Sequence, residues 1–116
     1  MTKYKLKVSD AVAFDVRFTL NDAGNPAEFG LRVEAKRTEA AVAGSSETVG
    51  EYLAARACVR MTAWLDDKCP LEDEAGQPVP PGADALAALY ELLPNMPGLV
   101  LGAYLEATGA KAKSGN

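Results

Sequence analysis

The 18-residue segment TVGEYLAARACVRMTAWL, residues 48–65, constrains the fold most, because it contains no proline and one glycine. Thr48 and Glu51 have the spacing of a capping box, in which each side chain bonds to a backbone N–H of the first helical turn. Apolar residues then recur at helical spacing and cover about half of the circumference. The segment therefore predicts a long central helix, with this main apolar side: Val49, Leu53, Ala54, Ala57, Cys58, Met61, Trp64 and Leu65.

The same helix would carry a second apolar patch, since Tyr52, Val59 and Ala63 fall on the opposite side, with Ala55 beside them. A helix that lies on a single surface is apolar on one side only. We therefore expect this second side either to be covered by the C-terminal helices or to bind a partner. The candidate partner-binding residues are Tyr52, Arg56, Val59, Arg60 and Ala63.

Two of these candidates are like charges four residues apart, a spacing that slightly destabilises a helix. Neither Arg56 nor Arg60 has an acidic residue three or four positions away. Two interpretations remain open. The arginines bind a partner, or they pair with Asp66, Asp67 or the acidic loop that follows.

Three segments alternate between apolar and polar residues, which is the period-two pattern of half-buried strands. They run from Tyr4 to Val8, from Val12 to Leu20 and from Phe29 to Ala35. Turn-forming residues 21–26 separate the last two, so the pattern predicts an antiparallel meander with one apolar and one charged face. The lysines between Tyr4, Leu6 and Val8 would form a solvated row that discourages edge-to-edge pairing, or a row that attracts an acidic partner.

Short helical patterns flank and follow the central segment. Residues 38–43 are a candidate short helix, and Leu86, Leu89, Tyr90 and Leu93 predict a helix over Ala83–Leu93. Pro97 suits a first helical turn and Gly109 a helix end, so a further helix is expected up to about Thr108. Between the central segment and the helix at Ala83 lies an acidic loop with four prolines, Asp66–Gly82. This loop fails the spacing of an EF-hand calcium loop. Residues 110–116 are expected to be a flexible tail.

The expected architecture is a single α+β domain over residues 1–109, of a size that buries roughly two thirds of its unfolded surface. A sheet of about three strands would pack on the central helix, with two or three short helices after it. The predicted core consists of Phe14, Phe18, Leu31, Val33, Leu53, Met61, Trp64, Leu89 and Tyr104.

Composition argues against several functions. The chain has no histidine, which removes most general-base, catalytic-triad and zinc-site chemistry. Residues 1–65 carry a net charge of +1 and residues 66–116 a net charge of −5, so neither half has the basic surface that nucleic-acid binding needs. No segment reaches the ~18 uninterrupted apolar residues of a membrane span. We expect no enzyme activity, metal or cofactor, and a cytosolic protein.

The two cysteines, Cys58 and Cys69, are read as free thiols in preference to a disulfide, as is usual in the cytosol.

From Trp64 onward the order of fragments resembles a known family. After Ala63-Trp64 come acidic residues, then the segments EAGQPVP (74–80), LPNMPGL (93–99) and GAYLEA (102–107), and a lysine-bearing end. This order is similar to the small tail assembly chaperones of long-tailed bacteriophages and prophages. In the family a Gly-Trp directly precedes an acid, whereas here Ala63 precedes Trp64 and Leu65 intervenes; the lysine near the end is also not directly before Asn116.

The resemblance implies a non-catalytic protein of the host bacterial cytoplasm that binds the phage tape measure protein and recruits tail tube protein. Weak self-association along an extended client would help such a role. Two alternatives remain open. A prophage-encoded homologue would block tail assembly of other phages through the same surfaces, and a generic prophage adaptor would bind an unrelated partner.

Overall fold

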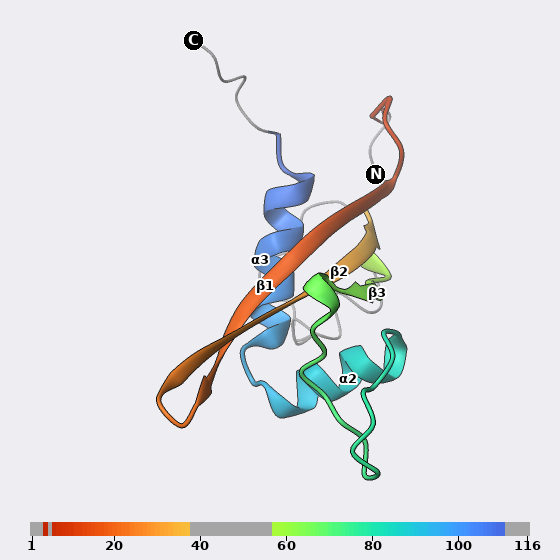
Figure 1. Ribbon diagram of the computed structural model, residues 1–116. Helices are drawn as coiled ribbons and strands as arrows, with labels where there is room; N and C mark the ends of the chain where they lie inside the picture. The colour runs from red at the N-terminus through yellow and green to blue at the C-terminus, as the bar shows by residue number, and fades with distance from the viewer. Residues whose placement is uncertain (1–3, 5, 38–56, 111–116) are drawn as a thin grey trace.

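A long antiparallel hairpin forms the centre of the computed structural model, which describes residues 4, 6–37 and 57–110. Strands β1 (Ala11–Asp22) and β2 (Asn25–Lys36) pair over their whole length (Figure 1). The connection is the two-residue turn Ala23-Gly24, in which both φ angles are positive, at 52° and 94°. Such a turn matches the twist of the flanking strands. The N–H of Gly24 donates a hydrogen bond to Asn21 Oδ1 at 2.7 Å.

A short third strand completes the sheet in the order β1-β2-β3. Strand β3 (Arg60–Trp64) lies antiparallel to β2. The register shifts at Thr62, because Arg32 faces Ala63 whereas the next residue of β2, Val33, faces Met61. The extra residue makes a β-bulge, and its hydroxyl donates to the carbonyl of Arg32 at 3.3 Å.

The predicted central helix is wrong at its C-terminal end, because Arg60–Trp64 is a strand and Leu65 begins a 3-10 turn. Cys58, expected on an apolar helix side, is exposed and has a φ of 51° just before the strand. Pairing with β2 outweighs the helical periodicity here, since a strand's stability comes from its neighbours rather than from local spacing. Residues 48–56 of the predicted helix, and the short helix over 38–43, lie outside the described residues.

The first predicted strand is also absent from the sheet. Tyr4, Leu6 and Val8 lie outside any strand, with exposed fractions of 83%, 64% and 60%. Within the described residues the sheet has three strands as expected, but β3 and not this segment is the third member.

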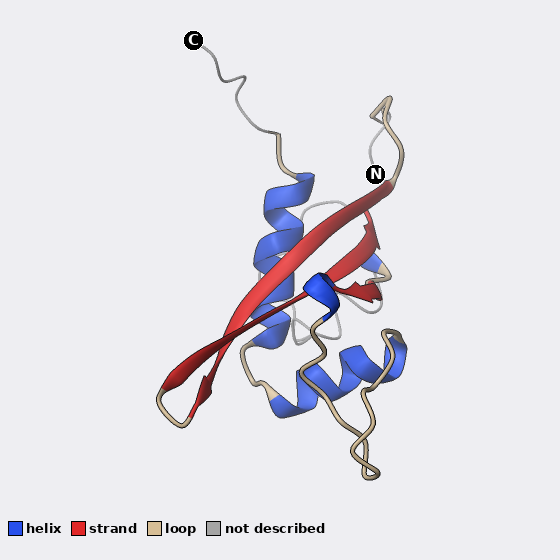
Figure 2. Cartoon of the chain, viewed as in Figure 1, coloured by secondary structure: helices blue, strands red, loops and turns tan. Residues whose placement is uncertain are grey.

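Two helices follow the sheet close to their predicted bounds. Helix α2 (Ala83–Leu92) and helix α3 (Met96–Thr108) carry Asp84 and Pro97 in their first turns. A negative charge and a proline are both favourable there. Helix α3 packs along β1 and α2 lies near β3, so both cover the same face of the sheet (Figure 2). The α+β class is therefore confirmed.

The core lies between this sheet face and the helices. Most of the predicted core residues are buried: Phe18, Leu31, Val33, Met61, Leu89 and Tyr104. Phe14 and Trp64 are half-buried against the core. Leu53 lies outside the described residues. The Tyr104 hydroxyl donates to the Lys36 carbonyl at 2.9 Å, and its ring meets Phe14 edge-on.

The loop between β3 and α2 crosses to the other face of the sheet. Its 3-10 turn η2 (Leu65–Asp67) places Leu65 over Gly30 of β2. Farther on, the loop folds into a narrow hairpin, closed by a bridge between Glu72 and Pro78. The Trp64 indole N–H donates to the carbonyl of Val79 at 2.8 Å and so fastens this loop to the end of β3.

Candidate partner-binding surface

The sheet face turned away from α2 and α3 is polar, and we call it the open face. Period-two alternation in β1 and β2 places charged residues on it, and β3 adds two more polar side chains. Every member is exposed except the half-buried Glu34: Asp15, Arg17, Glu28, Arg32, Glu34, Arg60 and Thr62. The charged sheet face expected from the sequence is thus present.

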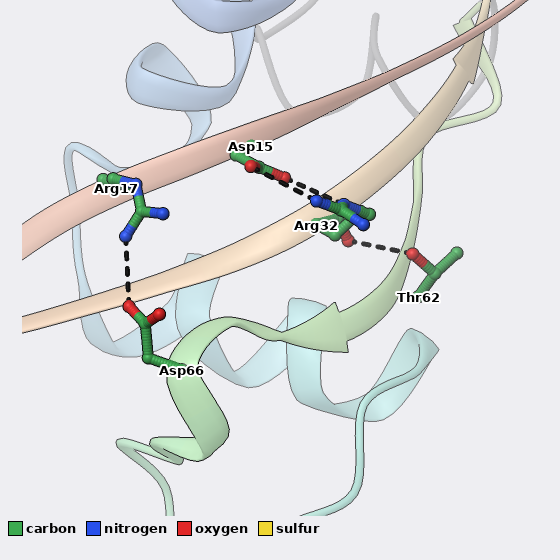
Figure 3. A network of polar contacts seen from close by, with 5 residues as sticks. All are labelled: Asp15, Arg17, Arg32, Thr62 and Asp66. Atoms are coloured by element: carbon green, nitrogen blue, oxygen red, sulfur yellow. Dashed lines mark hydrogen bonds and ion pairs between the residues drawn. The ribbon is translucent and has the colours of Figure 1, made fainter.

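Ion pairs order the open face. The Arg32 guanidinium binds both carboxylate oxygens of Asp15, at 2.9 and 3.4 Å, across the β1–β2 pair (Figure 3). The hydrogen bond and the charge of Asp15 raise the pKa of Arg32 above its ordinary value. Exposed pairs of this kind contribute little to stability, because solvent screens them. Their main effect is to hold the side chains in a defined pattern of alternating charge.

The other two ion pairs join β3 and its turn to the hairpin. Arg60 Nη2 lies 2.8 Å from Glu34 Oε1, and Arg17 Nη1 lies 3.2 Å from Asp66 Oδ2. Asp66 reaches Arg17 because η2 bends over β2 with a positive φ of 58° at Asp66 itself. The sequence offers no local signal for either pair, since the partners are 26 and 49 residues apart.

Two depressions lie at the margins of the open face. One, of about 300 Å³, lies beside the start of β3 and is lined by Ala11, Glu34, Ala35, Lys36, Cys58 and Arg60. The other, of about 250 Å³, lies beside η2 and is lined by Arg17, Phe18, Thr19, Glu28, Phe29, Asp66 and Lys68. Each is wide enough for a side chain of a partner.

The predicted binding residues are only partly brought together. Arg60 is exposed on the open face, and Ala63 shares that face because it is opposite Arg32. Val59 instead packs against the core, just before β3. Tyr52 and Arg56 lie outside the described residues. Arg60 pairs with Glu34, so neither Asp66 nor Asp67 is its partner.

Both cysteines are free, as the sequence predicted. Cys69 Sγ lies 3.2 and 3.3 Å from the carbonyl oxygens of Leu71 and Val79, so it belongs to the same loop anchor as Trp64. Among the described residues no group of three or more Cys, Asp or Glu side chains is arranged to hold a metal ion.

Within the described residues no single helix has the length and apolar character to cross a membrane. Only α2 and α3 taken together pass that test, and they are bent by 118° from each other.

Comparisons with known proteins give no relative: no family model matches the chain, and no significant match was found among curated proteins or solved structures.

Proposed function

We propose that the protein is a non-catalytic tail assembly chaperone, which binds a phage tape measure protein and recruits tail tube protein around it. The proposal rests on the ordered resemblance of residues 63–107 to that family. The open face is the surface that we assign to the client.

The observation that carries the proposal is that the resembling fragments all contribute side chains to one hydrophobic core. Trp64 and Val79, from two separate fragments, are joined by the indole hydrogen bond of 2.8 Å. The segment LPNMPGL forms the corner between α2 and α3, and its Met96 is fully buried. The GAYLEA segment supplies Tyr104, which bonds the end of β2. Fragments that recur in order in a family are expected to build one shared structural unit.

The open face has the chemistry of a transient protein interface. Such interfaces are often polar at their rim and enriched in arginine, and three arginines lie here: Arg17, Arg32 and Arg60. Their carboxylate partners leave other guanidinium N–H groups exposed toward solvent. A client that offers carboxylates or backbone carbonyls is therefore complementary to this face.

The direct test is co-expression with the tape measure protein encoded by the same phage genome. The expected result is that the tagged protein keeps the tape measure protein soluble and is captured with it, and that tail tube protein joins only when both are present. Deleting the gene is expected to give tailless heads while phage DNA replication continues. Normal tails of normal length in the deletion mutant would overturn the proposal and favour the blocking or adaptor alternatives.

A matched pair of variants tests the open face itself. Arg60→Gln and Glu34→Gln break the same ion pair, but only the first removes the arginine. If Arg60 contacts the client, Arg60→Gln weakens capture and Glu34→Gln leaves it unchanged or strengthens it, because the guanidinium is then free. Equal effects of the two variants would instead indicate that the ion pair acts by ordering β3.

A further inference from the structure

The outer edge of β1 has the features of a strand-binding site. The backbone carbonyl of Asp10 accepts a hydrogen bond from the N–H of Arg37, at 2.7 Å, and so points toward the β2 side. In an antiparallel pair the backbone groups of alternate residues face alternate sides, so those of Ala11, Ala13 and Asp15 face outward. No strand within residues 6–37 and 57–110 pairs with this edge. A long edge of this kind is a template for another strand.

A groove runs beside that edge on the helix side. It has a volume of about 180 Å³ and is lined by Phe14, Asp15, Ala103, Glu106 and Ala107, from β1 and α3. Phe14, Ala103 and Ala107 give it an apolar lining, and Glu106 adds a carboxylate. It therefore fits an apolar side chain carried by a strand that also bears positive charge.

The chain itself contains a segment of this chemistry. Tyr4, Leu6 and Val8 alternate with Lys3, Lys5 and Lys7, and the three apolar side chains are 83%, 64% and 60% exposed. A strand added to the edge of β1 would put its apolar residues on the groove side. Its lysines would then lie on the open-face side, where the Asp15 carboxylate, which also binds Arg32, is the nearest acid along β1.

The local hydrogen bonds favour the segment of another molecule over the segment of the same chain. Ser9 Oγ accepts from the N–H of Ala11 at 3.0 Å, so the first outward N–H of the edge is already bonded. The Arg37 side chain also bonds the Ser9 carbonyl, at 3.2 Å, which holds residues 9 and 10 in line with β1. A hairpin that turned back at Ser9-Asp10 would have to break these contacts.

We propose that the segment from Tyr4 to Val8 of one molecule adds to the outer edge of β1 in a second copy. An apolar side chain of the segment enters the Phe14–Ala103–Ala107 groove, and a lysine approaches Asp15 on the open-face side. The contact is heterologous, because the donating segment and the accepting edge are different surfaces of the same chain. It does not depend on the proposed client.

The test uses three full-length variants and sedimentation from low micromolar to near-millimolar protein. Leu6→Asp damages the segment, and Ala13→Pro removes an outward N–H without touching the pairing with β2. Leu92→Asp is the control, since Leu92 has the same exposed fraction, 64%, but lies at the end of α2. Circular dichroism checks that each variant is folded.

The wild type and Leu92→Asp are expected to gain mass with concentration, whereas Leu6→Asp weakens association about tenfold or more, as loss of a buried leucine does. Ala13→Pro alone should stay monomeric. A mixture of Leu6→Asp and Ala13→Pro should form a dimer and stop there, because one supplies an intact edge and the other an intact segment. Any of three outcomes overturns the proposal. The wild type stays monomeric at every concentration, Leu6→Asp self-associates as strongly as the wild type, or the mixture stays monomeric.

Discussion

Replacing Gly30 by alanine probes how η2 lies on the open face. A methyl group at this position would lie 2.6 Å from Leu65 Cδ1 and 3.3 Å from Leu65 Cβ. Ordinary carbon contacts are about 3.5–4.0 Å, so the leucine must move by close to 1 Å. Rotating the side chain relieves only the first contact, because Cβ is attached directly to the backbone of the turn. The turn itself must therefore shift.

The expected cost follows from two opposing effects. Overpacking of this kind costs about 1–3 kcal/mol. Alanine also restricts the unfolded chain, which stabilises a protein by about 0.4–1 kcal/mol at a compatible position. Gly30 has no positive φ, so alanine is compatible with its backbone. The overpacking is larger, and Gly30→Ala is expected to destabilise the protein by about 1–2 kcal/mol, which lowers Tm by several degrees.

Urea unfolding followed by the fluorescence of Trp64, the single tryptophan, measures this effect next to the turn. Gly102→Ala on α3 is the control, because a methyl group there meets nothing within 4 Å. It should stabilise the protein by about 0.5–1 kcal/mol, as removing a mid-helix glycine does.

The decisive comparison is Gly30→Ala in a Leu65→Ala background. Leu65→Ala removes the 2.6 Å contact and keeps the 3.3 Å contact of Cβ, so the Gly30 substitution should cost clearly less than in the wild type, with a coupling of about 0.5–3 kcal/mol between the two changes. If Gly30→Ala costs as much in the Leu65→Ala background as in the wild type, or stabilises the wild type as Gly102→Ala does, then Leu65 does not pack on Gly30.

Tyr90, Trp64 and the Arg60–Glu34 pair give the remaining predictions. The Tyr90 hydroxyl is buried and has no hydrogen-bond partner among the described residues, so Tyr90→Phe should stabilise the protein by about 1 kcal/mol in thermal unfolding. Burial raises the pKa of Tyr90 to about 12, so the unfolded tyrosine ionises first as the pH rises. Stability should therefore be intact below pH ~10 and fall between pH ~10 and 12, and it should fall less in Tyr90→Phe. The same slope of stability against pH in both proteins would refute this. Trp64→Ala should cost about 3 kcal/mol, at the low end for aromatic truncation because Trp64 is half-exposed, and an unchanged denaturation midpoint would contradict its packing. Arg60→Gln and Glu34→Gln should each change stability by less than about 0.5 kcal/mol, and a larger loss would show that their pair supports the fold.

The parts of the fold that sequence patterns predicted are those decided by local spacing. Strands β1 and β2 alternate cleanly, and a turn that requires positive φ lies between them. Helix α2 has leucines at helical spacing, and α3 buries Met96, Val100 and Tyr104, each four residues apart, between a start marked by Pro97 and an end marked by Gly109. In these elements local preference and tertiary packing agree, so the pattern alone is sufficient.

Strand β3 was missed because its five residues fit two periodicities. Met61 and Trp64 are three residues apart, which in a helix places them on one side. In the structure they also share a face, but through the bulge at Thr62, which shifts the register by one. A bulge makes a strand resemble a helical turn in its apolar spacing. Only the distant partner, β2, distinguishes the two, and short strands depend on such non-local pairing.

The segment from Tyr4 to Val8 poses the opposite problem. Its alternation predicts a strand, yet it joins no sheet in the described part of the chain. The alternation of apolar and polar residues predicts which side chains a segment would place on each face of a sheet. Pairing also requires a strand edge that the segment is able to reach. Ser9 Oγ already bonds the N–H of Ala11, and Arg37 bonds the Ser9 carbonyl, so these contacts oppose a hairpin that would turn back onto the edge of the same β1. An edge and a strand that both stay unpaired among the described residues can satisfy each other between copies, and this is the physical reason for the proposed assembly.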